Sequence, residues 1–259
     1  MPEMIEVEYY RRVAERLVGR ALTGVVAPDA WYLKGNTTAR ALQVALRGRT
    51  LTGTDRIGKL LLLETDGPTV GLRFGMTGRL LVDGEGPIEK LEYVSARRDP
   101  VWVRFGLRFA GGHTMQIEDP RRLGGVELAP DVSHLGVDAL VIGLAALRRG
   151  MAASRAPLKA WLLDQSRVAG IGNLLADEML WQAGLDPGRP ADSLDDQEAK
   201  RLHVYLRRTI TRALASGGSH TGDLQVARRR GATCPRDGAP LRRRTIGGRT
   251  TYSCPAHQR

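Results

Sequence analysis

Close to residue 130 of this 259-residue chain, the spacing of apolar residues changes from a strand-like to a helical period. Between about 40 and 128, apolar and polar residues alternate, most clearly over 101–109, and a period of two indicates half-buried antiparallel strands. From 137 to 216 the apolar residues recur at helical spacing. This change of period favours an α+β fold whose strands and helices lie in separate parts of the chain.

The individual elements follow from the same pattern. The segments 59–64 and 70–82 are predicted to be strands of an antiparallel β-sandwich. An amphipathic helix is predicted over the first twenty residues, because apolar residues recur every fourth position at Ile5, Tyr9, Val13 and Leu17. Later helices are predicted at 138–149, 158–165, 174–184 and 196–216, and the Gly247-Gly248 turn predicts a β-hairpin near the end.

Three domains are predicted from this order of elements. The pattern loosens around 128–136, where Pro130 and Asp131 stand, and this is where we place the first boundary. The domains are a β-sandwich domain over 1–130, a helical domain over 131–218 and a hairpin module over 219–259.

The charge of the chain is concentrated near its end. The sequence holds 39 Lys and Arg against 28 Asp and Glu, a net charge of +11. Between Arg207 and Arg259, twelve arginines stand against two aspartates, so nearly the whole excess lies in this segment. Such a basic segment favours a polyanionic partner, although an arginine-rich composition or a solvated basic tail gives the same count.

Several classes of protein are excluded by composition. Two cysteines cannot form a disulfide framework, and no apolar run approaches the roughly 18 residues of a membrane span. The N-terminal MPEMIEVEYYRR has acids where a secretion signal has a basic flank. These features predict a cytoplasmic, nucleoid-associated protein without a membrane partner.

The second residue is a proline, and acids follow at Glu3 and Glu6. Removal of Met1 would expose Pro2 as a secondary amine. At pH 7 roughly a tenth of α-amino groups is unprotonated, against roughly 0.04% of lysines, so this amine is a usable nucleophile toward an aldehyde-level carbon. Glu3 would donate or accept a proton beside it. An ordinary start whose acids cap the first helix explains the same residues.

A second motif, DQSRVAGIGNLLADE, occupies 164–178 between two apolar helical segments. Gly170 and Gly172 let the backbone approach a ligand closely and leave amide groups open at the start of the next helix. Asn173 is placed to cap that helix or to donate a hydrogen bond to a phosphate. A tight helix–helix connection is the plainer interpretation of this turn.

Five segments, in order, resemble the formamidopyrimidine-DNA glycosylase and endonuclease VIII family. The start MPEMIEVE is similar to that family's MPELPEVE, and DQSRVAGIGNLLADEMLWQAGLDP is similar to its helix-two-turn-helix signature. RIGKLLLLE, LRFGMTGRL and DPRRLGG resemble internal segments of the family. The resemblance spans essentially the whole chain, and it favours the nucleophile as the interpretation of Pro2.

The resemblance implies a bifunctional enzyme of base excision repair. Such an enzyme flips a damaged base out of double-stranded DNA, excises it, and cleaves the strand by elimination as an abasic-site lyase. It implies that Pro2 is the Schiff-base nucleophile, that Glu3 is the proton donor and that Glu6 assists at the sugar of the flipped nucleotide.

The resemblance also implies a set of DNA contacts. Lys59, on a β-hairpin, would hold phosphates that flank the lesion. The same strand would be gripped by the helix-two-turn-helix and the hairpin through Gly170, Gly172, Asn173 and Arg249. The space left by the extruded base would be filled by Met76, Arg121 and Leu123.

The C-terminal hairpin of this family commonly carries four cysteines in the pattern C-x2-C-x16-C-x2-C. The same register here holds Cys234, Asp237, Cys254 and His257. Zinc accepts thiolate, carboxylate and imidazole ligands, so a structural zinc site is predicted. A three-ligand site completed by His220 or water, and a hairpin without metal, are the alternatives, while a Cys234–Cys254 disulfide does not suit a reducing compartment.

The departures from the family concern the lesion. Met4-Ile5 replaces Leu-Pro, Leu123 stands where a phenylalanine is usual, and Phe74 precedes GMTG. The segment 216–234 is short for a lid over a flipped base, which resembles the endonuclease VIII branch, whereas PEMIEVE resembles the formamidopyrimidine branch. We expect a monomer that binds damaged double-stranded DNA, and a non-catalytic damaged-DNA binder of the same fold is the alternative.

Overall fold

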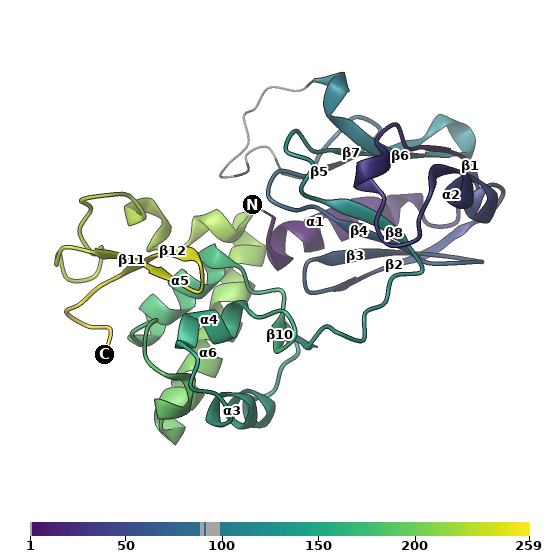
Figure 1. Ribbon diagram of the computed structural model, residues 1–259. Helices are drawn as coiled ribbons and strands as arrows, with labels where there is room; N and C mark the ends of the chain where they lie inside the picture. Colours follow the sequence, from purple (N-terminus) through teal and green to yellow (C-terminus); the bar gives the residue numbers. More distant parts are fainter. Residues whose placement is uncertain (1, 89–90, 92–98) are drawn as a thin grey trace. The chain divides into compact units, whose positions relative to one another are not determined.

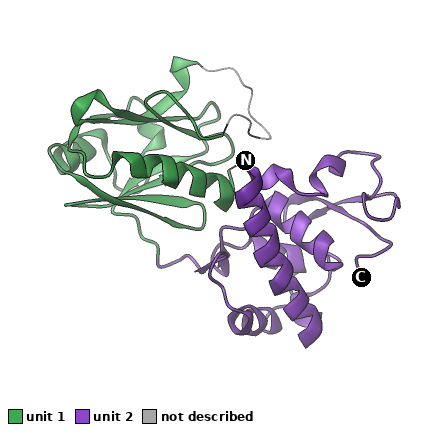
Figure 2. Cartoon of the chain, turned by 180° about the vertical axis from the view of Figure 1, so that it is seen from behind, with its two compact units in different colours: residues 1–132 green, residues 133–259 purple. Residues whose placement is uncertain are grey.

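The computed structural model describes residues 2–88, 91 and 99–259, and the chain divides into two compact units. Unit 1 comprises residues 1–132 and unit 2 residues 133–259 (Figure 2). The hairpin segment belongs to the second unit, and the three-domain division stays a prediction. None of the helices in the described ranges combines the length and apolar character of a membrane span.

Unit 1 is the antiparallel sandwich that the alternating pattern predicts (Figure 1). One sheet has the order β1 (Leu22–Val26), β6 (Val103–Phe109), β7 (Thr114–Glu118), β5 (Arg79–Val82). The other has the order β2 (Leu51–Ile57), β3 (Leu60–Thr65), β4 (Val70–Arg73), β8 (Gly125–Leu128). Helix α1 (Met4–Ala14) contributes Val7 and Tyr10 to the core between the sheets, and the Tyr10 and Phe74 rings lie 4.6 Å apart.

The segment 70–82 is not the single strand that its pattern predicts. It forms β4 and β5, which belong to different sheets and are separated by a turn over 74–78. Gly78 N–H donates to the Phe74 carbonyl at 2.8 Å, and Gly75 takes a left-handed φ of +56°. The two glycines therefore permit a turn that carries the chain from one sheet to the other and presents Met76 at its tip.

One helix prediction and one strand prediction in unit 1 also need correction. Helix α1 ends at Ala14 and continues only as the 3₁₀ turn Glu15–Leu17, before Gly19 adopts a φ of +86°. The region predicted to be β from residue 40 begins with helix α2 (Ala39–Leu46), which Thr38 caps by accepting a hydrogen bond from Ala41 N–H at 3.1 Å. Local capping chemistry outweighs the alternation there.

Unit 2 consists of the predicted helices followed by the hairpin. The helices are α3 (Leu144–Ala152), α4 (Leu158–Leu163), α5 (Asn173–Ala183) and α6 (Asp196–Ser216), and the hairpin pairs β11 (Arg242–Ile246) with β12 (Arg249–Ser253). Helix α5 is buried on nearly all sides and forms the centre of the unit.

Both units also contain short 3₁₀ turns. Besides Glu15–Leu17, those in unit 1 are Ala30–Tyr32, Pro100–Trp102 and Ala110–Gly112, and those in unit 2 are Ala191–Ser193, Ser219–Thr221 and Gln225–Ala227.

The helix predicted over 138–149 begins six residues later than its pattern suggests. Val137–Asp138 form β9, which pairs in parallel with β10 (Val168–Ala169), and Asp138 accepts a hydrogen bond from Leu140 N–H at 2.8 Å. Gly143 then caps α3. The short β-pair uses the backbone groups that a longer helix would have required.

Candidate functional site

The N-terminus of α1 carries Glu3 and Glu6 in a capping box. Glu3 N–H donates to Glu6 Oε2 at 2.7 Å, and the Glu3 carboxylate accepts from the backbone of Glu6. Both side chains are buried, at 0% and 2% exposure. The positive end of the helix favours carboxylates here, so the interpretation that the acids cap α1 is correct in structural terms. The same box fixes Glu3 directly beside the buried residue Pro2.

Lys59 lies in the turn between β2 and β3, which confirms the predicted β-hairpin position. Arg56 ties this turn to α1, because its Nη1 donates to the Gly58 carbonyl at 2.8 Å while its Nε lies 3.4 Å from Glu8 Oε2. The Arg56 side chain is only 4% exposed. Arg56 thus fixes the turn that carries Lys59 to the helix that begins after Glu3.

Two of the three side chains expected to fill the space of an extruded base lie in contact. Arg121 Nη1 is 3.6 Å from Met76 Sδ, and Leu123 is half exposed on the same loop as Arg121. Buried Asp119 organises both segments, since it accepts hydrogen bonds from the Thr77 hydroxyl and from Arg121 and Gly124 N–H. Sequence reasoning missed Asp119, although an aspartate before proline is a turn signal.

Arg122 between these residues is clamped by Asp29 from a distant part of unit 1. Its Nε and Nη2 donate to the two Asp29 oxygens at 2.7 and 2.6 Å. The bidentate pair holds Arg122 in a left-handed conformation with φ +57°, which a non-glycine residue rarely adopts. The Arg122 guanidinium also keeps the pKa of Asp29 below its usual range. No local pattern pointed to this pair.

The GIGN turn is built by the side chain of Gln165. Its amide oxygen accepts from Gly170 N–H at 3.0 Å, and its amide nitrogen donates to the Leu163 and Ile171 carbonyls. Gly170 has a φ of +112°, and Gly172 caps α5. Asn173 is therefore the first residue of α5 rather than its cap, and its buried Oδ1 has no hydrogen-bond partner among the described residues. The expectation that Asn173 caps this helix is therefore wrong, and phosphate binding by Asn173 stays a prediction.

The four predicted metal ligands lie together at the base of the hairpin. The ligand atoms of Cys234, Asp237, Cys254 and His257 are within 4.8 Å of one another, and His220 is not among them. Cys254 Sγ lies 3.2 Å from Asp237 Oδ2, which is 2.6 Å from His257 Nδ1. Tetrahedral zinc with bonds of about 2.0–2.3 Å separates its ligands by about 3.3–3.8 Å, so this donor set can hold a metal after small side-chain shifts.

Groups around the cluster support metal binding. Trp181 Nε1 donates to Cys234 Sγ at 3.3 Å and Ala256 N–H to Cys254 Sγ at 3.4 Å, contacts that stabilise thiolates. His257, with the Ala239 N–H, keeps the pKa of the Asp237 carboxyl well below its usual range. Burial raises the pKa of the Cys254 thiol to about 11, so a cation must replace that proton before the sulfur can act as a ligand.

A buried ionic network holds the hairpin against the helices. Lys159 Nζ lies 2.6 Å from Asp177 Oδ1, and both side chains are 0% exposed. Asp177 Oδ2 accepts from Arg228 Nε at 3.0 Å and from Tyr252 N–H at 3.3 Å, while Lys159 also donates to Thr251 Oγ1 at 2.8 Å. Because β12 is fixed to α4 and α5 in this way, exposed Arg249 after the Gly247-Gly248 turn has a defined place relative to the GIGN turn.

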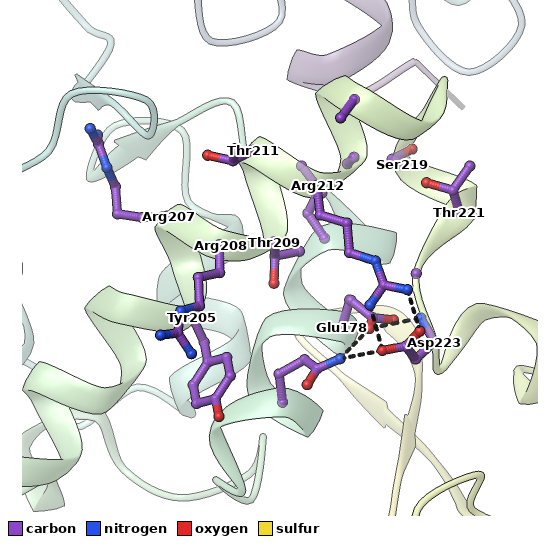
Figure 3. Close-up of a pocket in the computed structure, with 15 residues that line it drawn as sticks. Glu178, Tyr205, Arg207, Arg208, Thr209, Thr211, Arg212, Ser219, Thr221 and Asp223 are labelled. Atoms are coloured by element: carbon purple, nitrogen blue, oxygen red, sulfur yellow. Dashed lines mark hydrogen bonds and ion pairs between the residues drawn. The ribbon is translucent and has the colours of Figure 1, made fainter.

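A cavity of about 650 Å³ lies between α5, α6 and the segment 219–223. Figure 3 shows Arg212 and Asp223 facing each other in it, and their bidentate pair has distances of 2.6 Å. Glu178 accepts from Asp223 and Leu224 N–H, each at 3.0 Å. None of the predicted site residues lines this cavity, and its charged groups join α5 and α6 to the start of the C-terminal segment.

Comparisons with known proteins agree with this arrangement. The model of the formamidopyrimidine-DNA glycosylase N-terminal domain matches residues 1–126, and that of the formamidopyrimidine-DNA glycosylase H2TH domain matches residues 135–224. A formamidopyrimidine-DNA glycosylase of Thermus thermophilus is 36% identical over 286 residues, covering 100% of this chain and 98% of the relative. The enzyme of that name from Moorella thermoacetica is 37% identical, with 94% of each chain covered.

Solved structures give the same result. The Lactococcus lactis Fpg in complex with abasic-site-containing DNA superposes with a TM-score of 0.83 at 25% identity, with both chains covered completely. The same protein in complex with FAPY-dG-containing DNA has a TM-score of 0.84 at 26% identity, covering 99% of this chain and 100% of that one. With both units matched in order and over their full length, the chain belongs to the formamidopyrimidine-DNA glycosylase family.

Proposed function

We propose that this DNA glycosylase of base excision repair is bifunctional, excising a damaged base and then cleaving the strand at the abasic site. The observation that carries the proposal is the buried capping box of Glu3 and Glu6, which places a carboxylate beside Pro2. In a chain of this family, this arrangement supports attack of the N-terminal amine on a sugar carbon, with the adjacent carboxyl group transferring a proton during the same step.

The proposed chemistry needs only these groups and water. The unprotonated Pro2 nitrogen attacks C1′ of the flipped nucleotide, the glycosidic bond breaks, and the base leaves with a proton that Glu3 delivers. The Pro2 nitrogen then loses its proton to water, and the C1′–O4′ bond breaks as O4′ takes up a proton, which opens the sugar ring and leaves an iminium between Pro2 and C1′. The iminium makes a C2′ proton acidic, and removal of that proton expels the 3′ phosphate oxygen by elimination. Water then hydrolyses the iminium and frees the amine. Glu6 holds the Glu3 backbone throughout.

Both units supply the proposed grip on damaged double-stranded DNA by a monomer. In unit 1, Lys59 contacts phosphate, and the turn tip and loop that carry Met76, Arg121 and Leu123 enter the space of the extruded base. In unit 2, the GIGN backbone, Asn173 and Arg249 hold the phosphates. The position of Asn173 supports this role, because it is the first residue of α5, at the positive end of the helix, and its side-chain N–H groups can donate to a phosphate oxygen.

We propose zinc as the metal of the Cys234, Asp237, Cys254 and His257 cluster, where it has a structural role. Purified protein is expected to contain one zinc ion per chain by elemental analysis. Asp237→Ala should weaken zinc affinity by more than the about 10–100-fold that loss of an outer-shell partner costs, because it removes a direct ligand. His220→Ala, outside the cluster, is the matched control, and a loss of zinc from this variant would favour the alternative three-ligand site.

A panel of oligonucleotide duplexes tests the proposed function. Each duplex carries one lesion, namely an oxidised purine, an oxidised pyrimidine, a bulky adduct or an abasic site. Binding and strand cleavage are both measured, with undamaged duplex as the control. We expect cleavage at the abasic site and at one or more damaged bases. Tight binding to lesions without any cleavage would instead identify a non-catalytic damaged-DNA binder, and equal binding to all duplexes would contradict both functions.

A further inference from the structure

Trp31 is the one large aromatic side chain that the described part of unit 1 leaves mostly in solvent, with 67% exposure. It lies in the 3₁₀ turn Ala30–Tyr32, whose next residue, Tyr32, is fully buried. Lys34 Nζ sits 5.0 Å from the centre of the indole ring and donates to the Trp31 carbonyl at 2.7 Å. A tryptophan held in place but not covered is unusual, because this side chain gains most from burial.

The segment that carries Trp31 runs alongside the loop that carries Leu123. Asp29 binds the Arg122 side chain, the Tyr32 hydroxyl occupies the space where a side chain at Gly124 would lie, and Leu33 forms a parallel bridge with Val126. Lys34 N–H continues the pairing by donating to the Val126 carbonyl at 2.8 Å. The two segments therefore lie side by side and run in the same direction where Leu33 meets Val126.

The contacts between these segments bring the turn that carries Trp31 beside the loop that carries Leu123. Leu33, two residues after Trp31, bridges Val126, and the Asp29 carboxylate accepts from Trp31 N–H at 3.1 Å while it binds the guanidinium of Arg122, the residue before Leu123. Both Trp31 and Leu123 are exposed, at 67% and 50%.

We infer that Trp31 is a further DNA-binding residue, which stacks on a nucleobase left exposed when the damaged nucleotide is flipped out. The inference rests on the proposed function, in which the Leu123 loop enters the vacated space. A leucine fills volume but has no π-face, whereas an indole stacks on any base. Trp31 thus supplies beside Leu123 the stacking that Leu123 lacks, and the Lys34 ammonium adds positive charge facing a polyanion.

Two bases can meet this indole, namely the unpaired base opposite the lesion and the base that flanks it in the same strand. Both present the same aromatic chemistry. A fluorescent adenine analogue, 2-aminopurine, placed at one or the other position of a duplex with a stable abasic-site analogue distinguishes them, since its emission changes when it leaves one stack and joins another.

The test compares Trp31→Ala and Trp31→Phe with Val44→Ala, a matched control because Val44 is 76% exposed on α2 of the same unit. We expect Trp31→Ala to weaken binding to the abasic-analogue duplex about tenfold, within the range of one base stacked on an aromatic ring, and to leave binding to undamaged duplex unchanged. Trp31→Phe should retain most of the affinity, and Val44→Ala all of it.

Fluorescence gives a second readout that a folding defect would not imitate. Wild-type tryptophan emission should be quenched on binding the abasic-analogue duplex, Trp31→Phe should remove most of that quench, and the 2-aminopurine signal at one of its two positions should be lost in Trp31→Ala. Wild-type affinity for the abasic-analogue duplex in Trp31→Ala, an unchanged quench in Trp31→Phe, or equal weakening toward damaged and undamaged duplex would overturn the inference. Failure of wild-type protein to cleave abasic DNA would overturn the lyase proposal without touching these binding results.

Discussion

Blocking the N-terminal amine by retaining Met1 is expected to reduce covalent trapping on abasic-site DNA by about two orders of magnitude. With sodium borohydride present, wild-type protein should give an adduct whose DNA is attached to Pro2, as peptide mass spectrometry would show. With Met1 retained, the Pro2 nitrogen is a tertiary amide that cannot attack, and the new α-amino group belongs to Met1, one residue away from the position beside Glu3. Misplacement of a reacting group can cost about 10²-fold in rate, and the lysines have an unprotonated fraction roughly 250-fold smaller than that of an α-amino group at pH 7.

Two variants define how this result is interpreted. Pro2→Gly retains a terminal amine, so it should still trap, more slowly than wild type, because glycine changes the geometry beside Glu3. Lys59→Met retains Pro2 and should lose DNA affinity rather than the site of attachment. Equal trapping by wild type and by the form with Met1, or an adduct on Lys59, would show that the amine of Pro2 is not the nucleophile.

The second large effect is expected for Glu3→Gln. Loss of a positioned proton donor typically costs about 10²–10⁴-fold in rate, so base excision should fall by that factor. Cleavage of a pre-formed abasic site should fall much less, because the base has already left. The glutamine oxygen can still accept from Glu6 N–H, so the capping box and the melting temperature should be preserved.

Single-turnover assays on a damaged base and on an abasic site, run side by side, measure this difference. Glu15→Gln is the matched control, since Glu15 directly follows α1, is 56% exposed and forms an ion pair with Arg11 on the helix surface. If Glu3→Gln slowed both reactions equally, or if it lowered the melting temperature as much as the activity, the carboxyl group would be acting through the structure of α1 and not as a proton donor.

Short-range patterns in this sequence predicted most of what lies within one element. The GIGN turn was found from its own glycines. The four metal ligands were located from the spacing that the resemblance to the family supplied, and each pair belongs to a tight turn, in which Gly238 N–H donates to the Cys234 carbonyl and Gln258 N–H to the Cys254 carbonyl. The role of Asn173 as the first helical residue, and not the cap, depends on Gln165 filling the turn, which the glycines alone do not reveal.

Contacts between distant segments could not be predicted in this way. Asp29 and Arg122 stand far apart in the sequence, and with 39 basic and 28 acidic residues nothing local selects one partner from the others. The prediction of one strand over 70–82 is wrong for a related reason. Both halves of the segment carry the same alternation, and only the packing across the sandwich assigns them to different sheets.

The buried pair of Lys159 and Asp177 has a consequence for the order in which the chain is made. Both residues leave the ribosome well before Arg228, Thr251 and Tyr252, which supply the remaining partners of the pair. Until then Lys159 and Asp177 have each other but lack the further hydrogen bonds that offset the cost of their burial. We therefore expect unit 2 to complete its packing only when its last strand is available, and a prematurely terminated chain to be cleaved by proteases at α4 and α5 more readily than the full chain.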